Sequence, residues 1–107
     1  MTWTVRLLNE TVADELRAQP DDIRASLIRV RQAISRDGPT GLPRTFVKNI
    51  TGDLWELRLK GKSGIARAFY VTASRQRLFI VRIFTKKTQK TPPQEIKLAL
   101  ARAKEIV

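Results

Sequence analysis

Three consecutive segments of strand-like sequence, residues 54–60, 65–72 and 77–85, constrain the fold of this chain most strongly. Turn residues bound each of these segments. The connections LKGKSGIA and TASRQR are short enough for hairpins, so we expect an antiparallel meander. The N-terminal segment TWTVRLL, residues 2–8, predicts a further short strand.

Two helices are expected between the first strand and the meander. Asn9 can cap a short helix that ends near Arg17, and Pro20 begins a longer one. The apolar residues of the longer helix recur at helical spacing up to the break at Gly38, which favours one buried stripe. Residues 38–50, punctuated by glycine and proline, form the passage from the helices into the sheet.

A third helix is expected after the meander, with Thr91 as its N-cap, Pro92 as its first helical residue and Gln94 completing a capping box. This order of elements predicts an α+β fold, an antiparallel sheet with two N-terminal helices and a C-terminal helix, in a single domain that spans residues 1–107.

The composition excludes several classes of protein. Cysteine and histidine are absent, so there are no disulfides and no thiolate or imidazole ligands. With carboxylates scattered along the chain, we expect no metal site and no cofactor. No apolar run approaches the length of about 18 residues typical of a membrane span, and the N-terminus lacks the blocks of a signal peptide. We therefore expect a cytoplasmic protein.

The positive charge is concentrated in the middle of the chain. Of the net charge of +11, residues 54–90 supply most, because they hold ten lysines and arginines and the single acid Glu56. The flanking segments are nearly balanced. A clustered basic segment is typical of a protein that binds a polyanion, and it favours nucleic acid over a merely solvated surface.

Strand parity predicts how these charges are arranged, because alternate side chains share a face of the sheet. The residues expected to pack against the helices are Trp55, Leu57, Leu59, Tyr70, Phe79, Val81 and Ile83. The opposite face is then expected to be open and to carry Glu56, Arg58, Lys60, Arg67, Arg82 and Phe84. Arginine among apolar neighbours is costly without a partner, which indicates a site for an anion or a structural ion network.

The stretch FTKKTQKTPPQEI, residues 84–96, places three lysines directly before the third helix. Cations are disfavoured at a helix N-terminus, which already carries partial positive charge. An anion such as phosphate that binds there would explain the arrangement, because the free N–H groups and the lysines would both interact with it.

The segments LWELRLKGKSGIARAFY, IVRIFTKKTQKTPPQEI and LALARA resemble the phage-derived RelE/HigB-like toxins of type II toxin–antitoxin systems. The resemblance covers about residues 44–105. It implies a fold like that of the microbial ribonucleases and an endoribonuclease that cleaves mRNA, often on the ribosome, and so inhibits translation. It also implies a partner antitoxin, commonly a helix-turn-helix DNA-binding protein. A toxin of the same fold that poisons DNA gyrase and a non-catalytic nucleic-acid-binding module are the alternatives.

RNA can be cleaved without a metal because its own 2′-OH serves as the nucleophile. The candidate catalytic residues are Arg58 and Arg67, which would clamp the phosphate, with Glu56 and Lys87 as candidate acid or base. The candidate RNA-binding residues are Lys60, Lys62, Arg82, Phe84, Lys86 and Lys90. For Phe84, stacking on a base and packing at the end of the sheet are both open.

Overall fold

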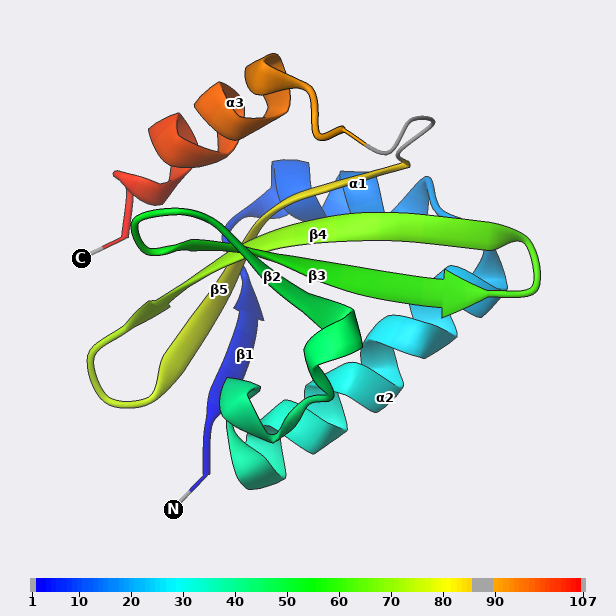
Figure 1. Ribbon diagram of the computed structural model, residues 1–107, viewed down its shortest axis with the longest axis horizontal. Helices are drawn as coiled ribbons and strands as arrows, with labels where there is room; N and C mark the ends of the chain where they lie inside the picture. Colours follow the sequence, from blue (N-terminus) through cyan, green and yellow to red (C-terminus); the bar gives the residue numbers. More distant parts are fainter. Residues whose placement is uncertain (1, 86–89, 107) are drawn as a thin grey trace.

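The computed structural model describes residues 2–85 and 90–106. The elements follow in the order β1 (Thr4–Leu7), α1 (Glu10–Arg17), α2 (Asp21–Asp37), the 3₁₀ turns η1 (Pro39–Gly41) and η2 (Arg44–Phe46), β2 (Val47–Thr51), β3 (Leu54–Gly61), β4 (Gly64–Ala73), β5 (Arg77–Thr85) and α3 (Pro93–Ala103). In these ranges the strands form one sheet in the order β1-β5-β4-β3-β2 (Figure 1). The α+β class and the meander of β3, β4 and β5 are confirmed.

The sheet is larger than the sequence predicted and is mixed rather than wholly antiparallel. The strand β1 runs parallel to β5, and the long connection through α1 and α2 allows this orientation. The strand β2 lies in what was expected to be a connecting passage and pairs with β3 as an antiparallel edge strand. Its five residues are exposed or only half-buried, so they carry a weak strand pattern.

The two N-terminal helices begin and end close to the expected positions. Asn9 caps α1, because its side-chain oxygen accepts a hydrogen bond from the backbone N–H of Val12 at 3.1 Å. Pro20 is the N-cap of α2 rather than its first residue, and Gly38, with φ +78°, ends it. None of the helices in the described ranges is long and apolar enough to cross a membrane.

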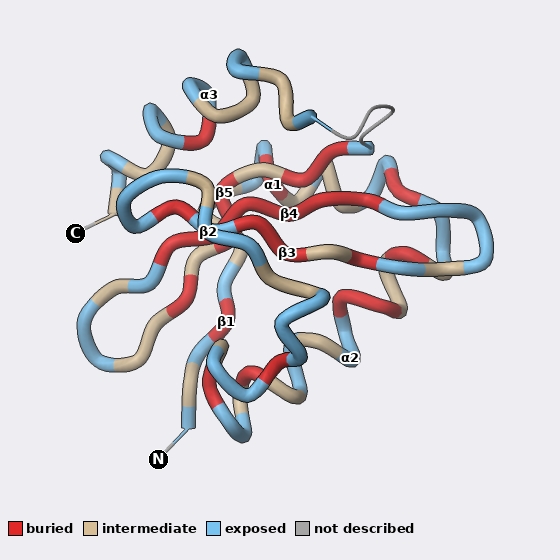
Figure 2. The backbone as a smooth tube through the Cα atoms, viewed as in Figure 1, coloured by how far each residue is buried: buried red, intermediate tan, exposed pale blue. Residues whose placement is uncertain are grey.

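Buried residues follow the strands on both faces of the sheet (Figure 2). On one face, α1 and α2 cover a core that includes Leu57, Leu59 and Tyr70, as predicted. On the other face, α3 packs over a second cluster, which consists of Leu54, Phe69, Val71, Val81, Phe84 and Ala99. The face expected to be open is therefore partly covered by the third helix. Trp55, expected in the core, is 37% exposed.

The predicted parity of the last strand is wrong over its first half. Phe69 is opposite Arg82 and Tyr70 is opposite Ile80, so Val81 is an extra residue, a β-bulge in β5. Before the bulge the faces are exchanged, so that Ile80 joins the core under α1 and α2 while Phe79 and Val81 lie under α3.

Candidate nucleic-acid interface

The two arginines expected to clamp a phosphate lie side by side. Arg58 on β3 and Arg67 on β4 are directly opposite one another in the antiparallel ladder, so their side chains leave the same face of the sheet. Glu56 is two residues away on β3 and shares that face. The parity of β3 and β4 thus brings Glu56, Arg58 and Arg67 together, as the sequence predicted.

The guanidinium of Arg67 is buried, with the residue 7% exposed. Its Nε lies 3.3 Å from Glu56 Oε1, an ion pair by distance, yet neither Nε nor Nη1 has a hydrogen-bond acceptor among the described residues. Burial, with a contribution from the charge of Arg58, lowers the pKa of Arg67, and Glu56 opposes that shift. Because buried N–H groups are nearly always satisfied, this guanidinium is suited to an incoming anion.

Glu56 is held between two elements. It is 4% exposed, and its Oε2 accepts a hydrogen bond from Thr91 Oγ1 at 2.9 Å. The predicted capping box is therefore wrong: Pro92 is the N-cap of α3, with no side-chain capping bond, and Pro93 is the first helical residue. The Thr91 hydroxyl instead fixes the carboxylate that lies beside Arg67. Sequence reasoning missed this role, since Glu56 is 35 residues away from Thr91 in the chain.

Arg82 and Phe84 take part in the packing beneath α3. The Nε and Nη2 atoms of Arg82 donate to the two carboxylate oxygens of Glu95 at 2.9 and 3.0 Å, and Nη1 lies 2.9 Å from Glu15 Oε2. These partners raise the pKa of Arg82, the hydrogen bonds that it donates to Glu95 most of all. Phe84 is 7% exposed and its ring contacts that of Phe69 edge to face. Of its two possible roles, stacking on a base or packing in the sheet, the structure therefore shows the packing role.

Exposed lysines lie around the arginine pair. Lys60, Lys62 and Lys90 are exposed, and the Nζ of Lys60 lies 6.0 Å from the centroid of the Phe46 ring. Arg58 and Lys60 also line a hollow of about 400 Å³ at the edge of the sheet. Two further candidates, Lys86 and Lys87, lie outside the described residues.

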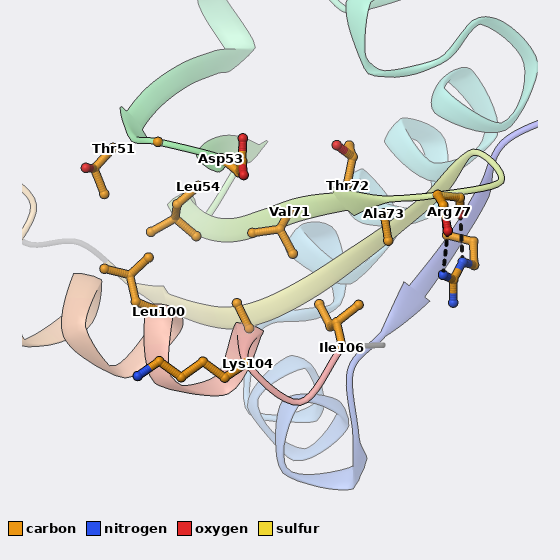
Figure 3. A pocket seen from close by; sticks show the side chains of 13 residues that line it. Thr51, Asp53, Leu54, Val71, Thr72, Ala73, Arg77, Leu100, Lys104 and Ile106 are labelled. Atoms are coloured by element: carbon orange, nitrogen blue, oxygen red, sulfur yellow. Dashed lines mark hydrogen bonds between the residues drawn. The ribbon is translucent and has the colours of Figure 1, made fainter.

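A second hollow on the α3 side has a different chemistry (Figure 3). It holds about 710 Å³ between α3 and the ends of β3 and β4, with Leu54, Val71 and Leu100 in its wall. The guanidinium of Arg77 at its rim is turned to Ser74, with Nε donating to the carbonyl oxygen at 2.8 Å. This largely apolar cleft does not include Arg58 or Arg67, so the charged site and the cleft are separate.

Comparison with known proteins identifies the fold and the family of this chain. A chain from the crystal structure of the archaeal RelE–RelB complex from Pyrococcus horikoshii OT3 is similar, with a TM-score of 0.57 and 21% sequence identity over 81% of this chain and 98% of that one. The fold is therefore RelE-like. The family model described as phage-derived protein Gp49-like matches residues 14–104, so the chain belongs to that family. No curated protein matches the sequence. The resemblance to phage-derived RelE-like toxins is confirmed for family and fold.

Proposed function

We propose that this protein is the toxin of a type II toxin–antitoxin pair and that it cleaves mRNA, on the ribosome, as a metal-independent endoribonuclease that inhibits translation. The observation that carries the proposal is the pair Arg58 and Arg67, opposite one another on one face, with buried N–H groups of Arg67 that no described residue satisfies. Membership of the Gp49-like family and the RelE-like fold support it.

In the proposed reaction, the 2′-OH of the RNA attacks the adjacent phosphorus while the bond to the 5′-oxygen breaks. The products are a 2′,3′-cyclic phosphate and a 5′-hydroxyl end. Arg58 and Arg67 would bind the phosphate oxygens and stabilise the charge of the phosphorane, because guanidinium donates parallel hydrogen bonds to them. One group must take the proton of the 2′-OH and another must protonate the leaving oxygen. Glu56 and Lys87 are the candidates for this acid and base. Lys60, Lys62, Lys86 and Lys90 would hold the flanking backbone.

An antitoxin is the proposed protein partner. The similar archaeal chain comes from a complex of RelE with RelB. In this chain, the segment 54–90 is strongly basic, so we propose a partner that covers the arginine face with acidic residues, commonly one with a helix-turn-helix DNA-binding domain.

The cleavage experiment compares purified wild type with Arg58→Ala and Arg67→Lys, with Arg31→Ala on α2 as the control that removes the same charge elsewhere. Arg67→Lys keeps the buried charge but loses the paired donors, so the fold is maintained. The RNA cleavage rate of each arginine-pair variant should fall by a factor of about 10²–10³, because one donor to the transition state is lost. The cleavage rate of Arg31→Ala should be unchanged.

The readout is end-group analysis of translated mRNA with and without EDTA. Cyclic phosphate ends that persist in EDTA are expected. A 5′-phosphate product, a requirement for metal or full activity in both arginine variants would reject the mechanism. Arrest of replication with intact mRNA would instead support the gyrase-poisoning alternative.

A further inference from the structure

A hollow of about 710 Å³ lies on the face of the sheet opposite to the arginine pair, beside η1 and β2. Trp3 and Trp55 both line it, and they are the two tryptophans of the chain. Trp55 is directly opposite Tyr70 on the neighbouring strand, and Tyr70, 3% exposed, is part of the wall. A large aromatic side chain that stays 37% exposed beside such a hollow is available to a ligand.

Positively charged residues also line this hollow. Arg44 is exposed and lines it, and Lys48 lines it from the edge strand β2, where its side chain leaves the other face of the sheet. No carboxylate is among its described lining residues. Aromatic rings bind unstacked nucleobases by stacking, and nearby cations bind the phosphates that connect those bases. The combination favours a single-stranded nucleic acid over an acidic protein segment, which would use the cations but not the ring faces.

The Trp3 side of the aromatic wall is held by contacts within the chain. The backbone N–H of Trp3 donates to the carbonyl of Ser35 at 2.9 Å. Its indole lies against Gly38, where an added Cβ would be 2.8 Å from Nε1. A ring held in this way loses little freedom when a base stacks on it, which favours binding.

The edge strand β2 connects this hollow with the arginine face. Lys48 is opposite Glu56 and therefore shares the face of Arg58 and Arg67, whereas the next residue, Asn49, is opposite Trp55 and shares the face of the hollow. Since β2 is the edge of the sheet, an extended strand of RNA can pass around it and contact both faces.

We infer that this tryptophan-lined hollow binds an unpaired base of the RNA, several nucleotides away from the bond that is cleaved. The inference rests on the proposed function for the identity of its ligand. It adds to the cleavage site a second contact that would select single-stranded RNA, because only an unpaired base offers a free face to stack on an aromatic ring.

The test uses a short 2′-O-methyl oligoribonucleotide, which lacks the nucleophile and therefore binds without being cleaved. All tryptophan fluorescence comes from this hollow, so binding should quench the emission of the wild-type chain. Heparin, a polyanion without bases, should bind the basic surface without quenching. Trp55→Leu should weaken oligonucleotide binding by about 5- to 100-fold, and Trp55→Phe should weaken it less, since phenylalanine still stacks.

The charge is tested by Arg44→Ala, which should lower the salt dependence of binding by about 0.7 in slope, with Arg6→Ala on β1 as the matched control. Thermal unfolding of each variant confirms the fold. Quenching in a protein that cleaves no RNA would support the hollow and reject the ribonuclease. Cleavage of mRNA without quenching, equal quenching by heparin, or equal effects of Arg44→Ala and Arg6→Ala would overturn the inference.

Discussion

Gly38 occupies a backbone conformation that glycine alone adopts readily, with φ +78° and ψ 171°. The same residue faces the Trp3 ring, so a side chain there meets two obstacles. Gly52 also has positive φ, at +50°, but an added Cβ would meet nothing within 4 Å. Substitutions at the two positions can therefore be compared. Both introduce backbone strain, but only the one at Gly38 also introduces a contact with the tryptophan.

Replacing Gly38 by alanine should destabilise the fold more than the same change at Gly52. The backbone term is about 1–3 kcal/mol at Gly38 and about 1–2 kcal/mol at Gly52. Overpacking against Trp3 adds about 1–3 kcal/mol at Gly38 only. Urea denaturation followed by tryptophan fluorescence measures both. Equal losses of unfolding free energy would mean that the Trp3 ring moves aside freely.

Individual residues of the site differ in how far the sequence could predict them. The pairing of Arg58 with Arg67 follows from the two-residue period of a strand and a short hairpin, both of which are local. The unsatisfied N–H groups of Arg67 and the bond from Thr91 to Glu56 depend on where α3 packs, which is a long-range property. A threonine before two prolines looks like a helix cap in the sequence, and only the packed structure shows its other partner.

At the scale of elements, the β-bulge in β5 is the reason why the observed faces of this strand differ from the predicted ones. One extra residue, Val81, exchanges the faces of the strand, and nothing in the alternation of this apolar segment marks it. Side chains from two helices satisfy the displaced backbone. The N–H of Ile83 donates to Glu15 Oε1 at 3.1 Å, and Arg102 Nη1 donates to the carbonyl of Val81 at 2.9 Å. The bulge therefore joins α1, β5 and α3.

Glu15 is the centre of this junction, because it also pairs with Arg82 and Arg102 at 2.9 and 2.8 Å. Burial opposes its ionisation, but the hydrogen bonds from Arg102 and Ile83 and the two positive charges outweigh burial, so the pKa of Glu15 lies below its usual value. A carboxylate with a lowered pKa in the folded state stabilises the fold above its unfolded pKa, and that stability is lost as pH falls through the folded pKa.

Glu15→Gln should therefore cost about 3–5 kcal/mol at neutral pH, because it leaves the paired arginines without their carboxylate. The loss should shrink as the pH falls from the pKa of an unfolded glutamate through the lower folded pKa of Glu15, because the wild-type carboxylate then becomes protonated too. The matched control is Glu10→Gln, whose pair with Arg17 is solvent-exposed and should contribute little to stability. Chemical denaturation of the three proteins across this pH range measures the effect. A loss at Glu15 that is independent of pH would contradict the role of its charge.

At the scale of the whole molecule, the two faces of the sheet differ in how far helices cover them and in the charge that they carry. The helices α1 and α2 cover one face, and α3 covers only part of the other (Figure 1). The arginine pair lies on the α3 face, with Lys60 and Lys62 on the same hairpin. Residues 54–90, which include this hairpin, carry most of the net charge. The positive electrostatic potential should therefore be strongest around these residues.

This asymmetry predicts how the proposed antitoxin associates. An acidic partner should be steered to the basic hairpin, so the association rate should fall steeply with added salt while the dissociation rate changes little. Lys60→Gln combined with Lys62→Gln should slow association and flatten its salt dependence, because both lysines are exposed and near the arginine face. Arg6→Gln combined with Arg31→Gln removes the same charge from the α2 and β1 side and should have little effect.

The partner for this measurement is the product of the reading frame beside the gene, which should also restore growth and co-purify when expressed with this chain. Stopped-flow association at several salt concentrations gives the rates for the wild type and both double variants. Equal slowing in the two double variants would show that the net charge alone steers the encounter. A chain that is harmless on its own and binds no neighbour would remove the basis of the antitoxin proposal, whereas a salt-dependent rate set by the hairpin lysines would locate the interface on the arginine face.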